Sequence, residues 1–193
     1  MPARTVRNHT SNDQAAIRHK TMTRKTGTRE QWLAVRLGLL RQAVSQVVLR
    51  WRNRRTIMND QAVQLVKQAY QLFKAGDIAS FLNLLTDDVL WVLPEMANVP
   101  FAGTWKGRQQ VRQFFSRLHA VQEVVEFAPE EFIGQGDKVV VLGRFTMHVT
   151  ATGKTSRSDW AHVWTVEGDR ASAVREYVDT LAVSRAHERA SAG

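Results

Sequence analysis

Residues Ser158–Thr180 alternate their side chains at the two-residue period of a β-strand, on both sides of the segment Glu167-Gly168-Asp169-Arg170. Glycine and aspartate favour tight turns, so this pattern predicts a β-hairpin. Pairing about the turn sets three residues of the first strand opposite three of the second: Trp160 opposite Val178, His162 opposite Glu176, and Trp164 opposite Val174. A neighbouring imidazole and carboxylate can hold a proton between them. If their face of the sheet is shielded from water, Glu176 is a candidate general base.

The charge of the chain is divided unevenly between two segments. Residues 1–57 contain 13 Lys and Arg against 2 Asp and Glu, a balance of +11, and residues 58–193 contain 14 against 16, a balance of −2; together they give the +9 of the whole chain. The length of 193 residues predicts one domain. Because residues 58–193 are near neutral, we expect no nucleic-acid binding by the domain itself.

The absence of cysteine from the sequence excludes disulfides, thiolate catalysis and cysteine zinc sites. The sequence has no apolar run long enough to span a bilayer. Its basic first segment lacks the short apolar core and small-residue cleavage site of a secretory signal. We therefore expect a cytoplasmic protein.

The basic first segment, residues 1–57, has two parts. Residues 1–28 are polar and poor in large apolar side chains, so we expect them to be disordered. Residues 29–55 predict an amphipathic helix, because apolar residues recur at helical intervals between arginines. The apolar residues are Trp32, Leu33, Val35, Leu39, Leu40, Ala43, Val44, Val47, Val48 and Trp51, and the arginines are Arg36, Arg41, Arg50 and Arg52.

Three interpretations of this helix remain open. It docks on the domain or on a dimer partner, it contacts an anionic membrane surface or nucleic acid, or it does not belong to the natural protein. We favour the third, because Met58-Asn59-Asp60 combines a possible start residue with residues that cap helices.

From residue 58 onward the pattern predicts an α+β domain over residues 58–185 and a tail over residues 186–193. Three helices come first, and Gly76 and Asp77 separate the first two. Antiparallel strands follow. The expected helices start at Asp60, Ile78 and about Val111, and the expected strands are Val89–Leu93, Val121–Ile133, Lys138–Thr150, Ser156–Val166 and Ala171–Val183. Such an order favours a curved sheet that wraps a helix and leaves a pocket between them.

Four sequence blocks carry a resemblance to a known family: AYQLFKAGDIASFLNLLTDDVLWVLP, FAGTWKGRQQVRQFF, KVVVLGRFTMHVTATGK and SDWAHVWTVEGDRASAVREYVDT. In order and spacing, over about residues 60–185, they resemble the nuclear transport factor 2-like (ketosteroid isomerase-like) superfamily, and within it the SnoaL-like polyketide cyclases. The resemblance implies a cone-shaped α+β barrel, three N-terminal helices packed on a curved antiparallel or mixed sheet, usually as a homodimer. Isomerases, cyclases, hydrolases, dehydratases and non-catalytic binders share this fold.

The resemblance also implies roles for three residues. Glu176 lies where the polyketide cyclases and limonene epoxide hydrolases carry a catalytic Asp, and His162 matches the cyclases' pocket histidine. Arg144 matches the epoxide hydrolases' pocket arginine, so we expect it to pair with Glu176 or to bind a substrate oxyanion. The alternative is that the three residues form a closed polar cluster in a non-catalytic binding domain.

Two activities of the superfamily are disfavoured. Thr146 stands where the epoxide hydrolases need a second Asp. Leu93 and Ala69 fall at the positions of the ketosteroid isomerases' catalytic Asp and oxyanion-hole Tyr, and neither side chain can replace those groups.

Aromatic residues predict an apolar pocket for a flat, cyclic or polyketide-like molecule. We expect the walls to include Tyr70, Trp91, Trp105, Phe115, Trp160, Trp164, Val174 and Val178. The histidines show no metal-binding spacing and no glycine-rich phosphate loop follows a strand, so we predict neither a metal site nor a cofactor. The sequence thus favours a cofactor-free acid–base enzyme of isomerase, cyclase or hydratase type.

Overall fold

The computed structural model describes residues 29–189 of the chain, which divides into two units, Met1–Ser45 and Gln46–Gly193. Two segments lie outside the described residues: residues 1–28, which the sequence predicts to be disordered, and residues 190–193, the end of the predicted tail. Within residues 29–189, none of the helices combines the length and apolarity needed to cross a bilayer.

The first helix, α1, spans Arg29–Lys74, whereas the sequence predicts one helix over residues 29–55 and a second from Asp60. The expected helix start at Asn59-Asp60 is therefore wrong. The helix continues through these residues because no glycine or proline occurs between Gly38 and Gly76 to interrupt it. The helix ends before Gly76, whose φ of 73° suits a C-terminal cap.

Three shorter helices follow: α2 (Ile78–Asn83), α3 (Arg108–Val121) and α4 (Thr180–His187). Asp77 caps α2 as predicted, since its carboxylate accepts a hydrogen bond of 3.0 Å from the Ser80 N–H. Helix α4 replaces the end of a strand that the sequence predicts to reach Val183. Asp179 stops the strand because its carboxylate accepts a 2.9 Å hydrogen bond from the Ala182 N–H and caps a helix instead.

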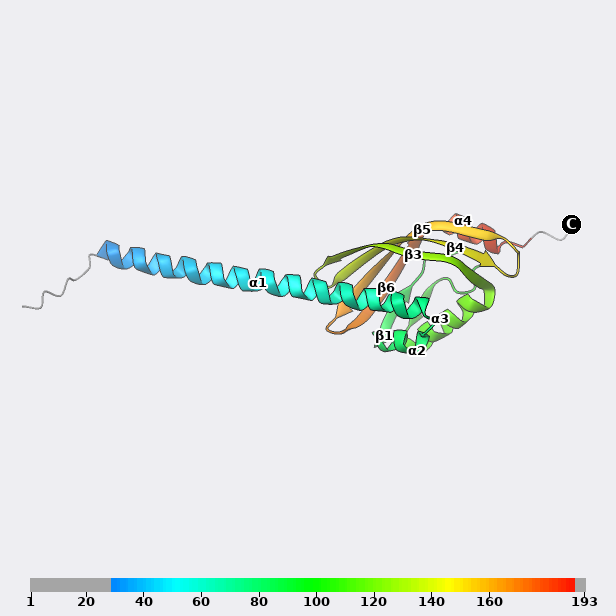
Figure 1. Ribbon diagram of the computed structural model, residues 1–193, viewed down its shortest axis with the longest axis horizontal. Helices are drawn as coiled ribbons and strands as arrows, with labels where there is room; N and C mark the ends of the chain where they lie inside the picture. Colours follow the sequence, from blue (N-terminus) through cyan, green and yellow to red (C-terminus); the bar gives the residue numbers. More distant parts are fainter. Residues whose placement is uncertain (1–28, 190–193) are drawn as a thin grey trace, which may run out of the picture. The chain divides into compact units, whose positions relative to one another are not determined.

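Six strands form one mixed sheet in the order β2-β1-β6-β5-β4-β3. Their bounds are β1 Leu85–Val92, β2 Thr104–Lys106, β3 Gln122–Gln135, β4 Lys138–Val149, β5 Thr155–Glu167 and β6 Arg170–Val178. Strands β1 and β6 run parallel, and the other neighbours are antiparallel. In Figure 1 the long strands curve over α2, α3 and the last turns of α1, which confirms the predicted α+β fold of helices on a curved sheet.

The β5–β6 hairpin has the predicted register. His162 pairs with Glu176, and the flanking pairs Trp160–Val178 and Trp164–Val174 also form. A bulge leaves Ser172 unpaired next to the turn, which shifts the register by one residue relative to the Glu167–Arg170 pair. The bulge keeps His162 and Glu176 directly opposite each other.

The core lies between the concave face of the sheet and the helices. From Trp160 to Val166 the even-numbered residues of β5, which include His162 and Trp164, are buried on this face. Gly143 on β4 pairs with Trp160, and a Cβ atom at this glycine would lie under 3.0 Å from the indole ring. The absence of a side chain at residue 143 therefore lets the ring lie flat on the neighbouring strand.

Candidate functional site

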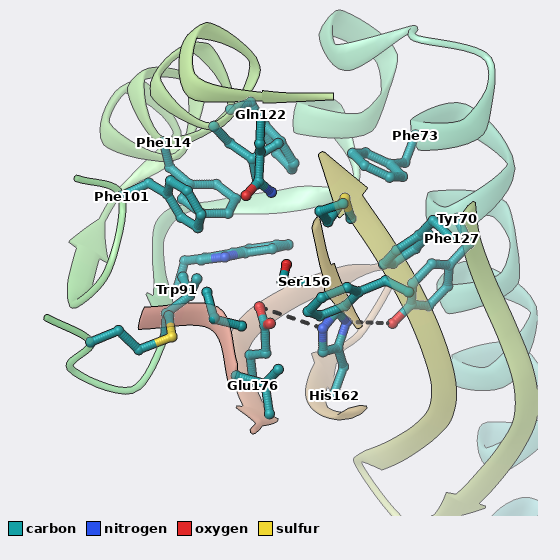
Figure 2. Close-up of a pocket in the computed structure, with 18 of the residues that line it drawn as sticks. Tyr70, Phe73, Trp91, Phe101, Phe114, Gln122, Phe127, Ser156, His162 and Glu176 are labelled. Carbon is teal, nitrogen blue, oxygen red and sulfur yellow. Dashed lines mark hydrogen bonds and ion pairs between the residues drawn. The ribbon is translucent and has the colours of Figure 1, made fainter. Parts of the chain in front are cut away.

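A cavity of about 70 Å³ lies between the sheet and the helices, and its walls are mostly aromatic. Figure 2 shows the rings on several sides of the site, with His162 and Glu176 projecting from the sheet. The lining residues comprise Tyr70, Phe73, Phe81, Trp91, Leu93, Met96, Phe101, Phe114, Phe115, Leu118, Gln122, Phe127, Phe145, Met147, Ser156, His162, Trp164, Glu176, Val178 and Val183. Few polar groups in an apolar cavity are typical of a small-molecule site.

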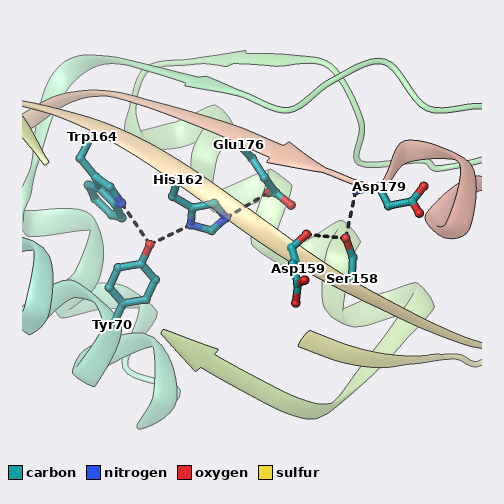
Figure 3. Close-up of polar contacts among 7 residues, drawn as sticks. All are labelled: Tyr70, Ser158, Asp159, His162, Trp164, Glu176 and Asp179. Carbon is teal, nitrogen blue, oxygen red and sulfur yellow. Dashed lines mark hydrogen bonds and ion pairs between the residues drawn. The ribbon is translucent and has the colours of Figure 1, made fainter. Parts of the chain in front are cut away.

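A chain of polar contacts joins α1 to the hairpin (Figure 3). The Trp164 indole N–H donates to the Tyr70 hydroxyl at 3.1 Å, and that hydroxyl lies 2.8 Å from His162 Nδ1. Burial raises the pKa of the Tyr70 phenol far above its usual value, so the hydroxyl keeps its proton.

These contacts determine which nitrogen of His162 carries the proton. An indole N–H is only a donor, so the Tyr70 oxygen accepts from Trp164 and directs its own hydrogen at His162 Nδ1. Nδ1 is then the acceptor, and in the neutral ring Nε2 bears the hydrogen. Nε2 is the nitrogen that faces Glu176.

Glu176 lies at the end of this chain. Its Oε2 atom is 3.6 Å from His162 Nε2, which is longer than a hydrogen bond. The two side chains are 17% and 9% exposed, respectively. The carboxylate is thus close to a fixed donor without being tied to it, and it retains acceptor capacity toward the cavity.

Replacing Tyr70 by Phe is expected to lower the free energy of unfolding by about 1–3 kcal/mol, since the Trp164 N–H and His162 Nδ1 would both lose a buried partner. We also expect the His162 ring to lose its single tautomer. Denaturant unfolding measures the first effect and ¹⁵N NMR of the imidazole the second. Unchanged stability together with an unchanged tautomer would contradict this role of the Tyr70 hydroxyl.

Arg144 does not join the pair formed by His162 and Glu176, which corrects the expected placement. Its side chain is 52% exposed and forms ion pairs with Glu126 and Glu130 on β3. The reason is strand parity: on β4 the odd-numbered Phe145 and Met147 are buried, so the even-numbered Arg144 points to the opposite face. Thr146 lies on this outer face as well.

Replacing Arg144 by Gln is expected to leave the affinity of the cavity for a ligand within about twofold of the unaltered protein, because an exposed ion pair on the far face contributes little. Parallel binding titrations of the two proteins check this. A loss of more than tenfold in affinity with intact folding would mean that the guanidinium reaches the site.

Some of the residues predicted to form the pocket walls line the cavity, and the others are buried elsewhere in the core. Tyr70, Trp91, Phe115, Trp164 and Val178 line the cavity.

Trp105, Trp160 and Val174 are buried elsewhere in the core and are absent from the cavity lining. Trp105 donates its indole N–H to the Phe101 carbonyl at 3.1 Å. Trp160 lies behind the site, stacked on His162 with ring centroids 4.2 Å apart. These three residues support the walls without forming them.

The sequence interpretation missed two polar residues of the cavity, Gln122 and Ser156, both of which are buried. Ser156 has the same even parity on β5 as His162, so the alternation that identified the histidine could also have identified the serine. Gln122 follows α3 at the first position of β3, where no periodic signal distinguishes it.

Among the side chains that the structure describes, no group of three or more His, Asp or Glu residues is arranged to hold a metal ion. The arrangement instead suits proton transfer: a carboxylate, a fixed imidazole N–H and an apolar wall that limits water.

Comparison with known families identifies the fold's relatives. A family model described as a SnoaL-like domain matches residues 66–174. The chain belongs to the SnoaL-like family. The matched residues include Tyr70, His162 and Trp164, and the match ends two residues before Glu176.

Solved structures place this SnoaL-like chain among NTF2-like proteins. An NTF2-like protein from Burkholderia xenovorans is 32% identical, with a TM-score of 0.63 over 67% of this chain and 98% of that one. TerC, co-crystallized with polyporic acid, is 30% identical, with a TM-score of 0.60 over 66% and 98%. A Mesorhizobium loti protein named as a SnoaL-like polyketide cyclase is 23% identical, with a TM-score of 0.51 over 59% and 96%, and shows the fold alone. No curated protein matches the chain.

Proposed function

We propose that this SnoaL-like domain is a cofactor-free acid–base enzyme of isomerase, cyclase or hydratase type, acting on a small apolar cyclic or polyketide-like substrate. Glu176 accepts the proton, and His162 lies beside the carboxylate with its Nε2–H directed toward it. The proposal rests on the position of the Glu176 carboxylate. The carboxylate lines an aromatic cavity, and its Oε2 atom lies 3.6 Å from His162 Nε2.

The positioning of His162 supports this assignment. Tyr70 contacts one ring nitrogen at 2.8 Å, and Trp160 stacks on the ring face, so the imidazole has little freedom to turn away from Glu176. A side chain that is held by packing and by a hydrogen bond loses no further entropy when substrate binds. Such preorganisation is more than a merely space-filling polar pair requires.

The cavity volume limits the size of the substrate. Sites for drug-sized ligands enclose roughly 300–1,000 Å³, whereas the volume here is about 70 Å³. We propose a substrate of one or two rings. Since a cavity of about 150 Å³ holds a single benzene ring, even such a substrate requires lining side chains to move, and the flexible Met96 and Met147 are suited to that. A larger molecule, such as the polyporic acid with which TerC was co-crystallized, would require a greater movement.

The proposed step is removal of a proton from a carbon next to a carbonyl group. The C–H bond breaks, the proton passes to the Glu176 carboxylate, and the electron pair moves to the carbonyl oxygen as an enolate. Return of the proton from Glu176 to a different atom gives isomerisation. Attack of the enolate carbon on a second carbonyl forms a C–C bond and an alkoxide, which takes the proton back from Glu176 and completes a cyclisation.

A ligand titration tests the proposal at the level of the pocket. The probes are 1-indanone, a flat two-ring ketone with an acidic α-carbon, and polyporic acid. We expect at least one to raise the melting temperature of the full chain in a concentration-dependent way, since a ligand that binds only the folded state stabilises it. Failure of both probes to bind up to their solubility limits would contradict the proposed substrate class.

The competing candidate is a non-catalytic binding domain of the same fold. The contacts among Trp164, Tyr70 and His162 favour a binding domain, because these polar groups satisfy one another's hydrogen bonds without a substrate. Binding of 1-indanone without any acceleration of its proton exchange would select this candidate.

A further inference from the structure

Two polar atoms of the cavity wall have no hydrogen-bond partner in the protein. They are the Trp91 indole Nε1 and the Ser156 Oγ, both fully buried. Other buried atoms without a partner, such as Thr86 Oγ1 and Trp160 Nε1, belong to residues that do not line the cavity. An unpartnered polar atom on a residue that lines a cavity marks a position where a bound molecule can complete the hydrogen bond.

The fold brings both groups to the same cavity as Glu176. Trp91 on β1 pairs with Val174 on the parallel strand β6, two residues before Glu176. Ser156 lies on β5 with the same inward parity as His162. Figure 2 shows the Ser156 oxygen and the Trp91 ring on the side of the site where the Glu176 carboxylate projects.

The chemistry of the two groups limits what can bind them. An indole N–H only donates, whereas a serine hydroxyl both donates and accepts. A ligand group that satisfies Trp91 must therefore be an acceptor, and a carbonyl or enolate oxygen can accept from both groups at once. A hydrocarbon ligand would leave both unsatisfied.

We infer that Trp91 Nε1–H and Ser156 Oγ–H form the oxygen-binding part of this pocket and select ring compounds that carry a carbonyl group. The inference rests on the proposed function and specifies its substrate class as cyclic ketones. When Glu176 removes the α-proton, the same two donors stabilise the charge that develops on the oxygen. These two donors have the oxyanion-binding role that the sequence analysis expects of Arg144.

The test compares 1-indanone with indane, which has the same ring skeleton without the oxygen. We expect the full chain to bind 1-indanone more tightly, and Ser156→Ala and Trp91→Phe each to weaken its binding roughly 3- to 10-fold. Binding of indane should change less than twofold in either variant. In the unaltered protein the Trp91 indole N–H resonance should move downfield with 1-indanone and stay in place with indane.

A matched control separates this role from general effects of lost polar groups. Thr86→Val removes a buried, unpaired hydroxyl from a residue outside the cavity lining. We expect this control to keep the preference for 1-indanone. The indole resonance of the unaltered protein provides the readout if Trp91→Phe does not fold.

The outcomes distinguish this inference from the proposed function. Equal binding of 1-indanone and indane, or a preference that survives both Trp91→Phe and Ser156→Ala, would overturn the oxygen-binding role while leaving the pocket intact. If neither 1-indanone nor indane bound, the inference would be overturned, and if polyporic acid also failed to bind, the proposed function would be overturned with it.

Discussion

Replacing Glu176 by Gln is expected to slow deuterium exchange at the α-carbon of bound 1-indanone by a factor on the order of 10²–10⁴, the range that a positioned general base contributes. The substitution keeps the size of the side chain and its place 3.6 Å from His162, but an amide cannot accept the proton. Binding of 1-indanone should change by less than about threefold. NMR exchange rates at saturating ligand, together with a binding titration, measure the two effects.

Glu131→Gln is the matched control, since Glu131 is exposed on β3 and does not line the cavity. We expect it to retain the full rate. If Glu176→Gln exchanged the α-protons within threefold of the unaltered protein, Glu176 would not be the base, and the polar chain from Trp164 to Glu176 would have a structural role.

The largest expected effect on stability comes from Gly143→Ala. The added Cβ would lie under 3.0 Å from the Ala128 carbonyl oxygen and from the Trp160 ring, and neither can yield easily. One belongs to the backbone of the paired strand β3, and the other stacks on Phe127 and on His162. We expect a loss of about 3 kcal/mol or more in the free energy of unfolding, which corresponds to a fall in Tm of roughly 10 °C.

The same substitution is also expected to lower turnover. Displacement of Trp160 moves the ring that stacks on His162 at 4.2 Å, so turnover should fall in the fraction that remains folded. Gly38→Ala serves as the control, because a Cβ there meets nothing within 4 Å and the residue lies in helix α1. A melting temperature for Gly143→Ala equal to that of the control would contradict the close packing at residue 143.

The hairpin was predictable because its signal is local. Alternation on both sides of one turn determines which residues of β5 meet those of β6, so the pairing of His162 with Glu176 follows from the sequence. The same two-residue period predicts that Arg144 lies on the outer face of β4, because its neighbour Phe145 is buried on the inner face. The resemblance assigns Arg144 by block position, which carries no information about the face of the strand.

Other features depend on contacts that no local pattern reports. Tyr70 was expected in the pocket wall, but its hydrogen bonds to His162 and Trp164 join residues 92 and 94 positions apart in the chain. The unpaired state of Trp91 and Ser156 is likewise a property of what surrounds them in the fold. Side-chain partners of this kind require the tertiary structure.

The most direct test of the account is the time course of α-proton exchange of 1-indanone in D₂O with the full chain, followed by ¹H NMR. Glu176 projects into the cavity from one strand, so a base at this position approaches a flat ketone from one side. We predict exchange faster than in buffer and preferential loss of one of the two α-protons. Exchange at the buffer rate for both protons, under conditions where 1-indanone is bound, would contradict catalysis by this site.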